Sequence, residues 1–137
     1  MIYRLLVAVS LLCLCQCNSL HTTGSAPNLP ITKLAIVKND KIHMSGFQPE
    51  LVKQVGEMGI TAEVVDVAPQ DESYYLVYTA NWSWDLAMYL RYFRAELYRG
   101  PVRVGSTEYR TSDLDMNKFG ATANKIRGPL RRLLRGE

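Results

Sequence analysis

Residues 74–100 read YYLVYTANWSWDLAMYLRYFRAELYRG, and this stretch decides the fold. In its first half, every second residue belongs to a strongly aromatic set, and the residues between them are smaller or more polar. This alternation is the two-residue period of a β-strand. The aromatic set consists of Tyr74, Leu76, Tyr78, Ala80, Trp82 and Trp84. Residues 87–98 predict the returning strand, and Gly100 and Pro101 separate it from a third strand over 102–108. The stretch therefore predicts a three-strand antiparallel meander.

The residues before the meander predict a strand, a helix and a second strand. An apolar run over 31–38 ends at the turn pair Asn39 and Asp40, and residues 61–67 form the second β-prone run. Between them, apolar residues recur at helical spacing after Pro49 and stop at Gly59. These apolar residues are Leu51, Val52, Val55 and Met58. We expect one crossover unit whose two strands are parallel.

The C-terminal residues predict a second helix. Its apolar side consists of Ile126, Leu130, Leu133 and Leu134, and arginines 127, 131, 132 and 135 surround it. Pro129 lacks a backbone donor, so it is expected to kink this helix or to start its last turns afresh. The arginines fit either a solvated helix face or a contact with anionic lipid headgroups.

Together these elements predict an α+β fold. It is a two-layer sandwich, in which a mixed sheet of about five strands carries two helices on one face. The 137 residues leave room for one such domain, over 31–137.

The first residues predict a secretory signal. Arg4 gives a positive start, and residues 5–15 form an apolar run interrupted only by Ser10. This run is about half of the roughly 20 residues that a transmembrane helix needs, so we expect its removal. The protein's three cysteines, Cys13, Cys15 and Cys17, all fall in or beside this leader. The rest of the chain therefore offers no disulfide framework and no thiolate site.

The end of the leader resembles the lipobox of bacterial lipoproteins, in the sequence Leu14, Cys15, Gln16 and Cys17. That resemblance implies cleavage after residue 16, a diacylglyceryl group on Cys17 and usually acylation of the new amino terminus. Gln16 departs from the small residue that the motif prefers, so Cys15 and Cys13 remain alternative acceptors. In the competing interpretation the leader is an ordinary cleaved one whose cysteines are only small apolar residues.

We divide the chain into a lipoprotein signal peptide over 1–16, an acylated Cys17 with a flexible tether over 17–30, and the domain. The tether is expected because residues 18–30 are rich in Gly, Ser, Thr, Asn and Pro and lack an apolar period.

The aromatic cluster is the leading candidate for a binding surface. Most of it is expected to pack in the core and in cross-strand pairs, while an exposed part would bind glycan, peptide or protein. The residues proposed for this surface are Tyr75, Trp82, Trp84, Asp85 and Tyr89. Asp85 fits a turn-capping residue better than an acid whose pKa is raised among aromatic rings.

Other chemistry has little support in the sequence. The net charge is +3, and removal of the leader with Arg4 would leave about +2. Such a small positive charge gives little basis for nucleic-acid binding. His21 and His43 are isolated, so we expect no metal and no cofactor. Because no phosphate loop, serine elbow or HExxH helix occurs, we do not expect an enzyme.

The stretch quoted above, followed by NKFGATANKI at 117–126, resembles a family of small uncharacterised lipoproteins of Gram-negative bacteria. The resemblance implies an envelope protein anchored by lipid, with Asn18 favouring the outer membrane and a body facing the periplasm. It implies no activity and no catalytic residues. Our hypotheses are a non-enzymatic module that binds an envelope protein or the cell wall, a structural subunit of an envelope or transport complex, and a hydrolase of envelope polymers, which would need two converging carboxylates.

Overall fold

The computed structural model describes residues 19–24, 30–112 and 114–137 of the chain. Over these residues the strands are β1 (Ser19–Gly24), β2 (Lys33–Val37), β3 (Thr61–Val65), β4 (Tyr74–Asp85), β5 (Ala87–Arg99) and β6 (Val102–Arg110). The helices are α2 (Phe47–Glu57), α3 (Thr122–Arg135) and the 3₁₀ turn η1 (Met116–Phe119). The six described strands form one sheet in the order β1-β6-β5-β4-β2-β3.

The predicted crossover is confirmed. β2 pairs in parallel with β3, from Lys33 opposite Thr61 to Val37 opposite Val65, and α2 connects the two strands. The helix ends where the sequence predicts, since Gly59 follows it with a φ of 75°, a conformation that glycine adopts without steric cost.

The meander is also confirmed, with β4, β5 and β6 antiparallel and adjacent. The β4–β5 register shifts between Asn81 and Trp82, because β5 contains one extra residue between the positions paired with them, Tyr92 and Leu90. The face alternation of β5 therefore changes there, whereas in β4 Trp82 still packs on the core side against Phe47. The hairpin turns at Leu86, between the paired residues Asp85 and Ala87.

The tether prediction is wrong for residues 19–24. They form β1, which pairs antiparallel with β6 from Ser19 opposite Arg110 to Gly24 opposite Gly105. The reason is that β6 would otherwise leave a row of unpaired backbone donors and acceptors, and a polar segment can satisfy them through its own backbone. β1 thus begins two residues after Cys17 in the sequence. Cys17 itself lies outside the described residues.

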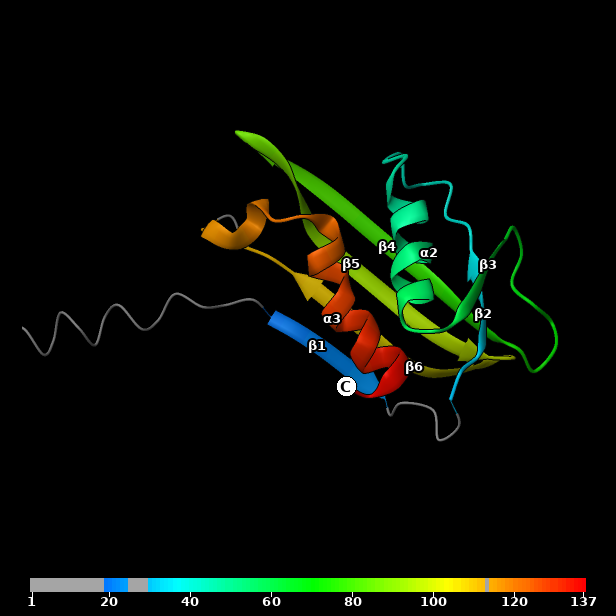
Figure 1. The fold of residues 1–137 in the computed structure, drawn as a ribbon. Coiled ribbons are helices and arrows are strands. Elements are labelled where there is room, and N and C mark those ends of the chain that lie inside the picture. The colour runs from blue at the N-terminus through cyan, green and yellow to red at the C-terminus, as the bar shows by residue number, and fades with distance from the viewer. Residues whose placement is uncertain (1–18, 25–29, 113) are drawn as a thin grey trace, which may run out of the picture.

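Both helices lie on the same side of the sheet, as expected (Figure 1). Phe47, at the start of α2, forms the centre of the core, with ring centroids 5.0 Å from Trp82 and 5.9 Å from both Tyr78 and Phe93. α3 runs as a single helix through Pro129, which is buried, so the predicted restart at this proline does not occur. The expected α+β sandwich is therefore the observed architecture, with β1 as an additional edge strand.

Candidate functional site

The loop end of the β4–β5 hairpin presents apolar side chains to solvent. Trp84 is 68% exposed and Leu86 is 89% exposed, and Met88 also lies open. Leu86 has a φ of 60°, the left-handed region in which glycine and asparagine are comfortable and leucine is not. The turn would therefore be more stable with another residue, and its side chain is the most exposed apolar group of the hairpin.

A second apolar segment lies beside this hairpin. Leu114, at 92% exposure, together with Met116 and Phe119, extends the open apolar surface along η1 and the two residues before it. The two segments are held together by Phe119, whose ring packs edge-on against Tyr89 at 5.9 Å. We call this combined surface the apolar end, and it consists of Trp84, Leu86, Met88, Leu114, Met116 and Phe119.

An ion pair also joins the two segments of the apolar end. The Lys118 Nζ atom lies 2.5 Å from an Asp85 carboxylate oxygen. The lysine side chain is only 5% exposed, whereas that of Asp85 is 53% exposed. Lys118 Nζ also lies 5.2 Å from the ring centre of Tyr89 and 5.1 Å from that of Phe119. A buried ammonium needs such compensation, so this lysine helps to fix η1 against the hairpin.

The five residues proposed from the sequence fall in three different places. Trp84 and Asp85 lie at the apolar end, and Trp82 is half-buried against Phe47. Tyr75 lies elsewhere, paired with Tyr98 at the end of the β4–β5 ladder that is farthest from the hairpin turn. Tyr89 does not belong to an exposed surface, because it is 3% exposed and packs under η1. Asp85 forms an ion pair rather than the turn cap expected from the sequence.

The sequence did not predict the exposed apolar residues of η1 and of the segment just before it. Leu114, Met116 and Phe119 follow no helical or strand period, so no pattern set them apart from an ordinary loop. The only available signal was that three large apolar residues occur in the short segment between the predicted third strand and the predicted C-terminal helix.

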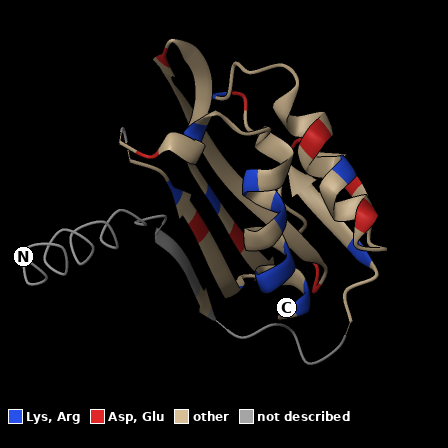
Figure 2. Cartoon of the chain, turned by 60° about the vertical axis from the view of Figure 1, so that its left-hand side comes forward, with Lys and Arg blue, Asp and Glu red and all other residues tan. Residues whose placement is uncertain are grey.

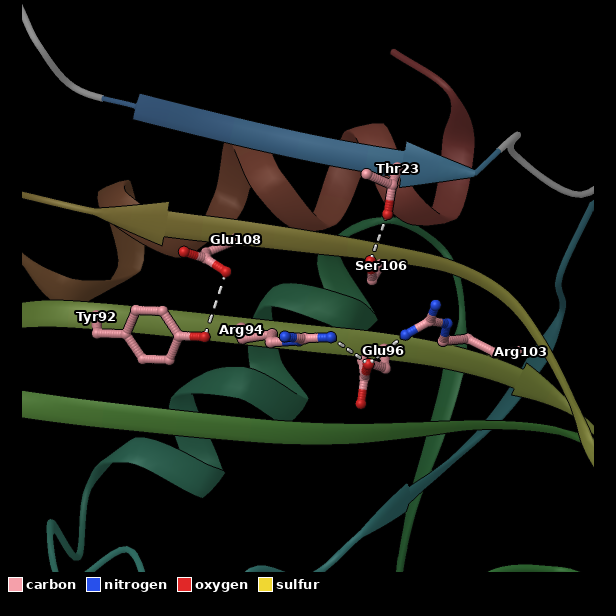
Figure 3. A network of polar contacts seen from close by, with 7 residues as sticks. All are labelled: Thr23, Tyr92, Arg94, Glu96, Arg103, Ser106 and Glu108. Carbon is pink, nitrogen blue, oxygen red and sulfur yellow. Dashed lines mark hydrogen bonds and ion pairs between the residues drawn. The ribbon is translucent and has the colours of Figure 1, made fainter.

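The face of the sheet opposite the helices carries a polar and aromatic network, which lies in front of the strands while the helices lie behind them (Figure 3). Glu96 accepts hydrogen bonds from Arg94 at 2.7 Å and from Arg103 at 2.9 Å. Burial alone would raise the pKa of Glu96, but these two guanidinium groups outweigh it and lower the pKa below its ordinary value. Glu96 is therefore held as a carboxylate.

Aromatic rings continue this open face on both sides of Glu96. The rings of Tyr75 and Tyr98 stack with centroids 5.1 Å apart and planes 7° from parallel. Tyr92 donates a hydrogen bond to Glu108 at 3.3 Å, and Arg110 lies over its ring at 5.0 Å. The result is a surface of paired charges and flat rings, and we call it the open sheet face. Its members are Tyr75, Tyr92, Arg94, Glu96, Tyr98, Arg103, Glu108 and Arg110.

The arginines of α3 line a groove of about 490 Å³ against α2. Figure 2 shows them as blue segments along this helix. Arg127 donates to Gln54 at 2.9 Å and to Glu57 at 3.3 Å, and Arg131 pairs with Glu137 at 2.7 Å. The groove thus contains two carboxylates, but both are occupied by arginine partners. This arrangement ties α2 to α3 and gives no support to a hydrolytic pair.

The described residues contain neither a metal-binding cluster nor a membrane-spanning helix. In the part of the chain that the structure places, no cluster of three or more His, Cys, Asp or Glu residues has metal-binding geometry. Over the same residues, no helix combines the length and the apolar character needed to cross a bilayer.

Comparison with known proteins supports the fold. No family model matches the chain, and no curated protein matches it. Two solved structures are similar, both of PelC from Paraburkholderia phytofirmans. One PelC dodecamer is 15% identical with a TM-score of 0.60, over 85% of this chain and 98% of that chain. A leucine-to-methionine variant, also a dodecamer, is 16% identical with a TM-score of 0.56, over 85% and 94% of the two chains. At this identity the likeness establishes a shared fold, and both similar structures are assemblies of twelve copies.

Proposed function

We propose that this protein is a non-enzymatic lipoprotein of the bacterial envelope, anchored through Cys17 and assembled with further copies of itself. The observation that carries the assembly is the open sheet face. One side of the sheet is covered by α2 and α3, while the other side offers paired charges and stacked tyrosines over three long strands. Such rings and arginines are common in protein interfaces.

The dodecamers with the same fold support self-assembly, because they demonstrate that this architecture can be built into an assembly of twelve copies. The leader supports the anchor, since the lipobox-like residues at 14–17 are separated from β1 by Asn18 alone. The location that we propose is the periplasmic side of the outer membrane, on the basis of Asn18.

Native mass spectrometry of the acylated protein in mild detergent tests the assembly. We expect an oligomer that the charge reversal Arg94→Glu dissociates, because it places a second carboxylate beside Glu96 on the open sheet face. The matched control is Arg131→Glu, an arginine on the helical side, which should leave the oligomer intact. A protein that stays monomeric at every concentration would show that the self-assembly proposal is wrong.

Mass analysis of the mature amino terminus tests the anchor. We expect a chain that begins at Cys17 and carries acyl groups, and the Cys17→Ser variant should keep its leader and lose its acylation. An unmodified terminus downstream of residue 17 would contradict the lipoprotein proposal without touching the assembly.

A structural subunit of an envelope or transport complex is the second candidate. The apolar end favours it, because a partner protein could cover those side chains. Crosslinking in cells from residue 114, followed by identification of the adduct, separates a foreign partner from a second copy of this chain.

A further inference from the structure

We propose that the apolar end enters the membrane interface beside the lipid anchor, so that the domain is held at the bilayer in one orientation. The proposal rests on the proposed anchor at Cys17, and it adds a contact that the anchor by itself does not supply.

The first support is the end of the sheet at which the chain enters the domain. β1 begins at Ser19, opposite Arg110, and Arg110 is opposite Tyr92 on β5. The hairpin turn at Leu86 and the η1 segment lie at this same end of the sheet (Figure 1). The anchor and the apolar end therefore face the same way.

The second support is the shortness of the connection. Ser19 is two residues from Cys17, a distance of at most about 7 Å for an extended chain. The hairpin extends six residues past Tyr92, which corresponds to about 20 Å along the strand. The connection to the anchor is therefore shorter than the distance by which the hairpin extends toward the anchored end. Because of this difference, Trp84 and Leu86 reach the bilayer.

The third support is the chemistry of the surface. Six large apolar side chains are open in the described part of this end, and one of them is the tryptophan that favours the boundary between acyl chains and headgroups. The loop end of the hairpin is free of blue segments and shows one red segment (Figure 2). That acidic residue, Asp85, is paired with Lys118, so neither charge enters the interface uncompensated.

The strain at Leu86 points the same way. A leucine at a φ of 60° weakens the turn, and its side chain contributes little to the folded body because it is almost fully exposed. Insertion into lipid gives this side chain an apolar environment that the folded protein does not provide.

Tryptophan fluorescence of the acylated protein in phosphatidylcholine vesicles tests the proposal. The protein has two tryptophans, so the Trp82→Phe variant reports on Trp84 alone. In vesicles whose acyl chains carry bromine, we expect loss of Trp84 emission relative to unbrominated vesicles, a blue shift, and protection from iodide in the water. The matched control is Trp84→Phe, in which Trp82, packed against Phe47, should keep its emission.

Four results would overturn the proposal. Trp84 could remain open to iodide while the acylated protein stays bound to the vesicles, which leaves the anchor intact and removes the insertion. It could be protected from iodide but not quenched by brominated lipid, which would assign the apolar end to a second copy. Quenching that vanishes at molar salt would assign the contact to charged groups. A chain that carries no acyl group and does not bind vesicles would overturn the anchor and the insertion together.

Discussion

The ion pair between Asp85 and Lys118 predicts an asymmetric response to mutation. Replacing Asp85 by Ala leaves the ammonium of Lys118, on a side chain only 5% exposed, without its carboxylate partner. Removing one partner of a buried charge costs about 3 kcal/mol or more, but the carboxylate here is half exposed, so we expect a loss of about 1–2 kcal/mol in the free energy of unfolding.

The reverse replacement should be tolerated. Lys118→Met keeps the apolar stem between the rings of Tyr89 and Phe119 and removes the charge, and Asp85 can turn its carboxylate to water. We expect a change within about 1 kcal/mol. The double variant should then be more stable than Asp85→Ala alone, because it no longer contains the ammonium that has lost its Asp85 carboxylate.

Urea unfolding of the four proteins at pH 7, followed by circular dichroism, measures this cycle. The reasoning would be refuted if Lys118→Met lost as much stability as Asp85→Ala, or if the double variant lost the sum of the two single losses. Either result would mean that the lysine is retained for its own packing or for other contacts, and that the carboxylate does not stabilise it.

Three further predictions concern single sites. Phe47→Ala removes the ring at the centre of the core and should lower the free energy of unfolding by about 3–5 kcal/mol, whereas the control Leu114→Ala at an exposed site should change it by less than about 0.5 kcal/mol, both measured by urea unfolding. Glu96→Gln should cost about 0.5–1 kcal/mol at pH 7, and because the folded state lowers the pKa of Glu96, this difference should fade as the pH drops below the ordinary glutamate value and through the lowered one; a difference that grew in acid would contradict this. Leu86→Asn should raise stability by about 1 kcal/mol in thermal unfolding, since asparagine tolerates the positive φ, and an unchanged or lower stability would show that the turn carries no strain.

The sequence predicted the elements whose side chains carry a period. The aromatic alternation from residue 74 and the helical spacing from Leu51 to Met58 describe surfaces that pack mostly against the core, and the strand and the helix that they predict were confirmed. The stop at Gly59 was also confirmed, and it rests on the positive φ of this glycine. The crossover of β2, α2 and β3 followed from their order along the chain.

β1 and the apolar end were beyond the reach of such patterns for a common reason. The pairing of β1 depends on the backbone of β6, so its own side chains need not alternate. The surface at Leu114, Met116 and Phe119 depends on contacts with Tyr89 and Asp85, which lie about 30 residues earlier in the chain. In the first case the polar composition of residues 18–30 predicted a tether instead of a strand. In the second case the two segments that form the surface are too far apart in the sequence for a local pattern to connect them.

The ladder of β1 also determines how the domain responds to force. A force that pulls on the N-terminus acts parallel to β1 and to its neighbour β6. It therefore loads all six residue pairs from Ser19 to Gly24 in shear at the same time. A ladder pulled lengthwise resists far better than one peeled open pair by pair. With the anchor that we propose at Cys17, thermal motion of the bilayer would be transmitted through β1 to the whole sheet.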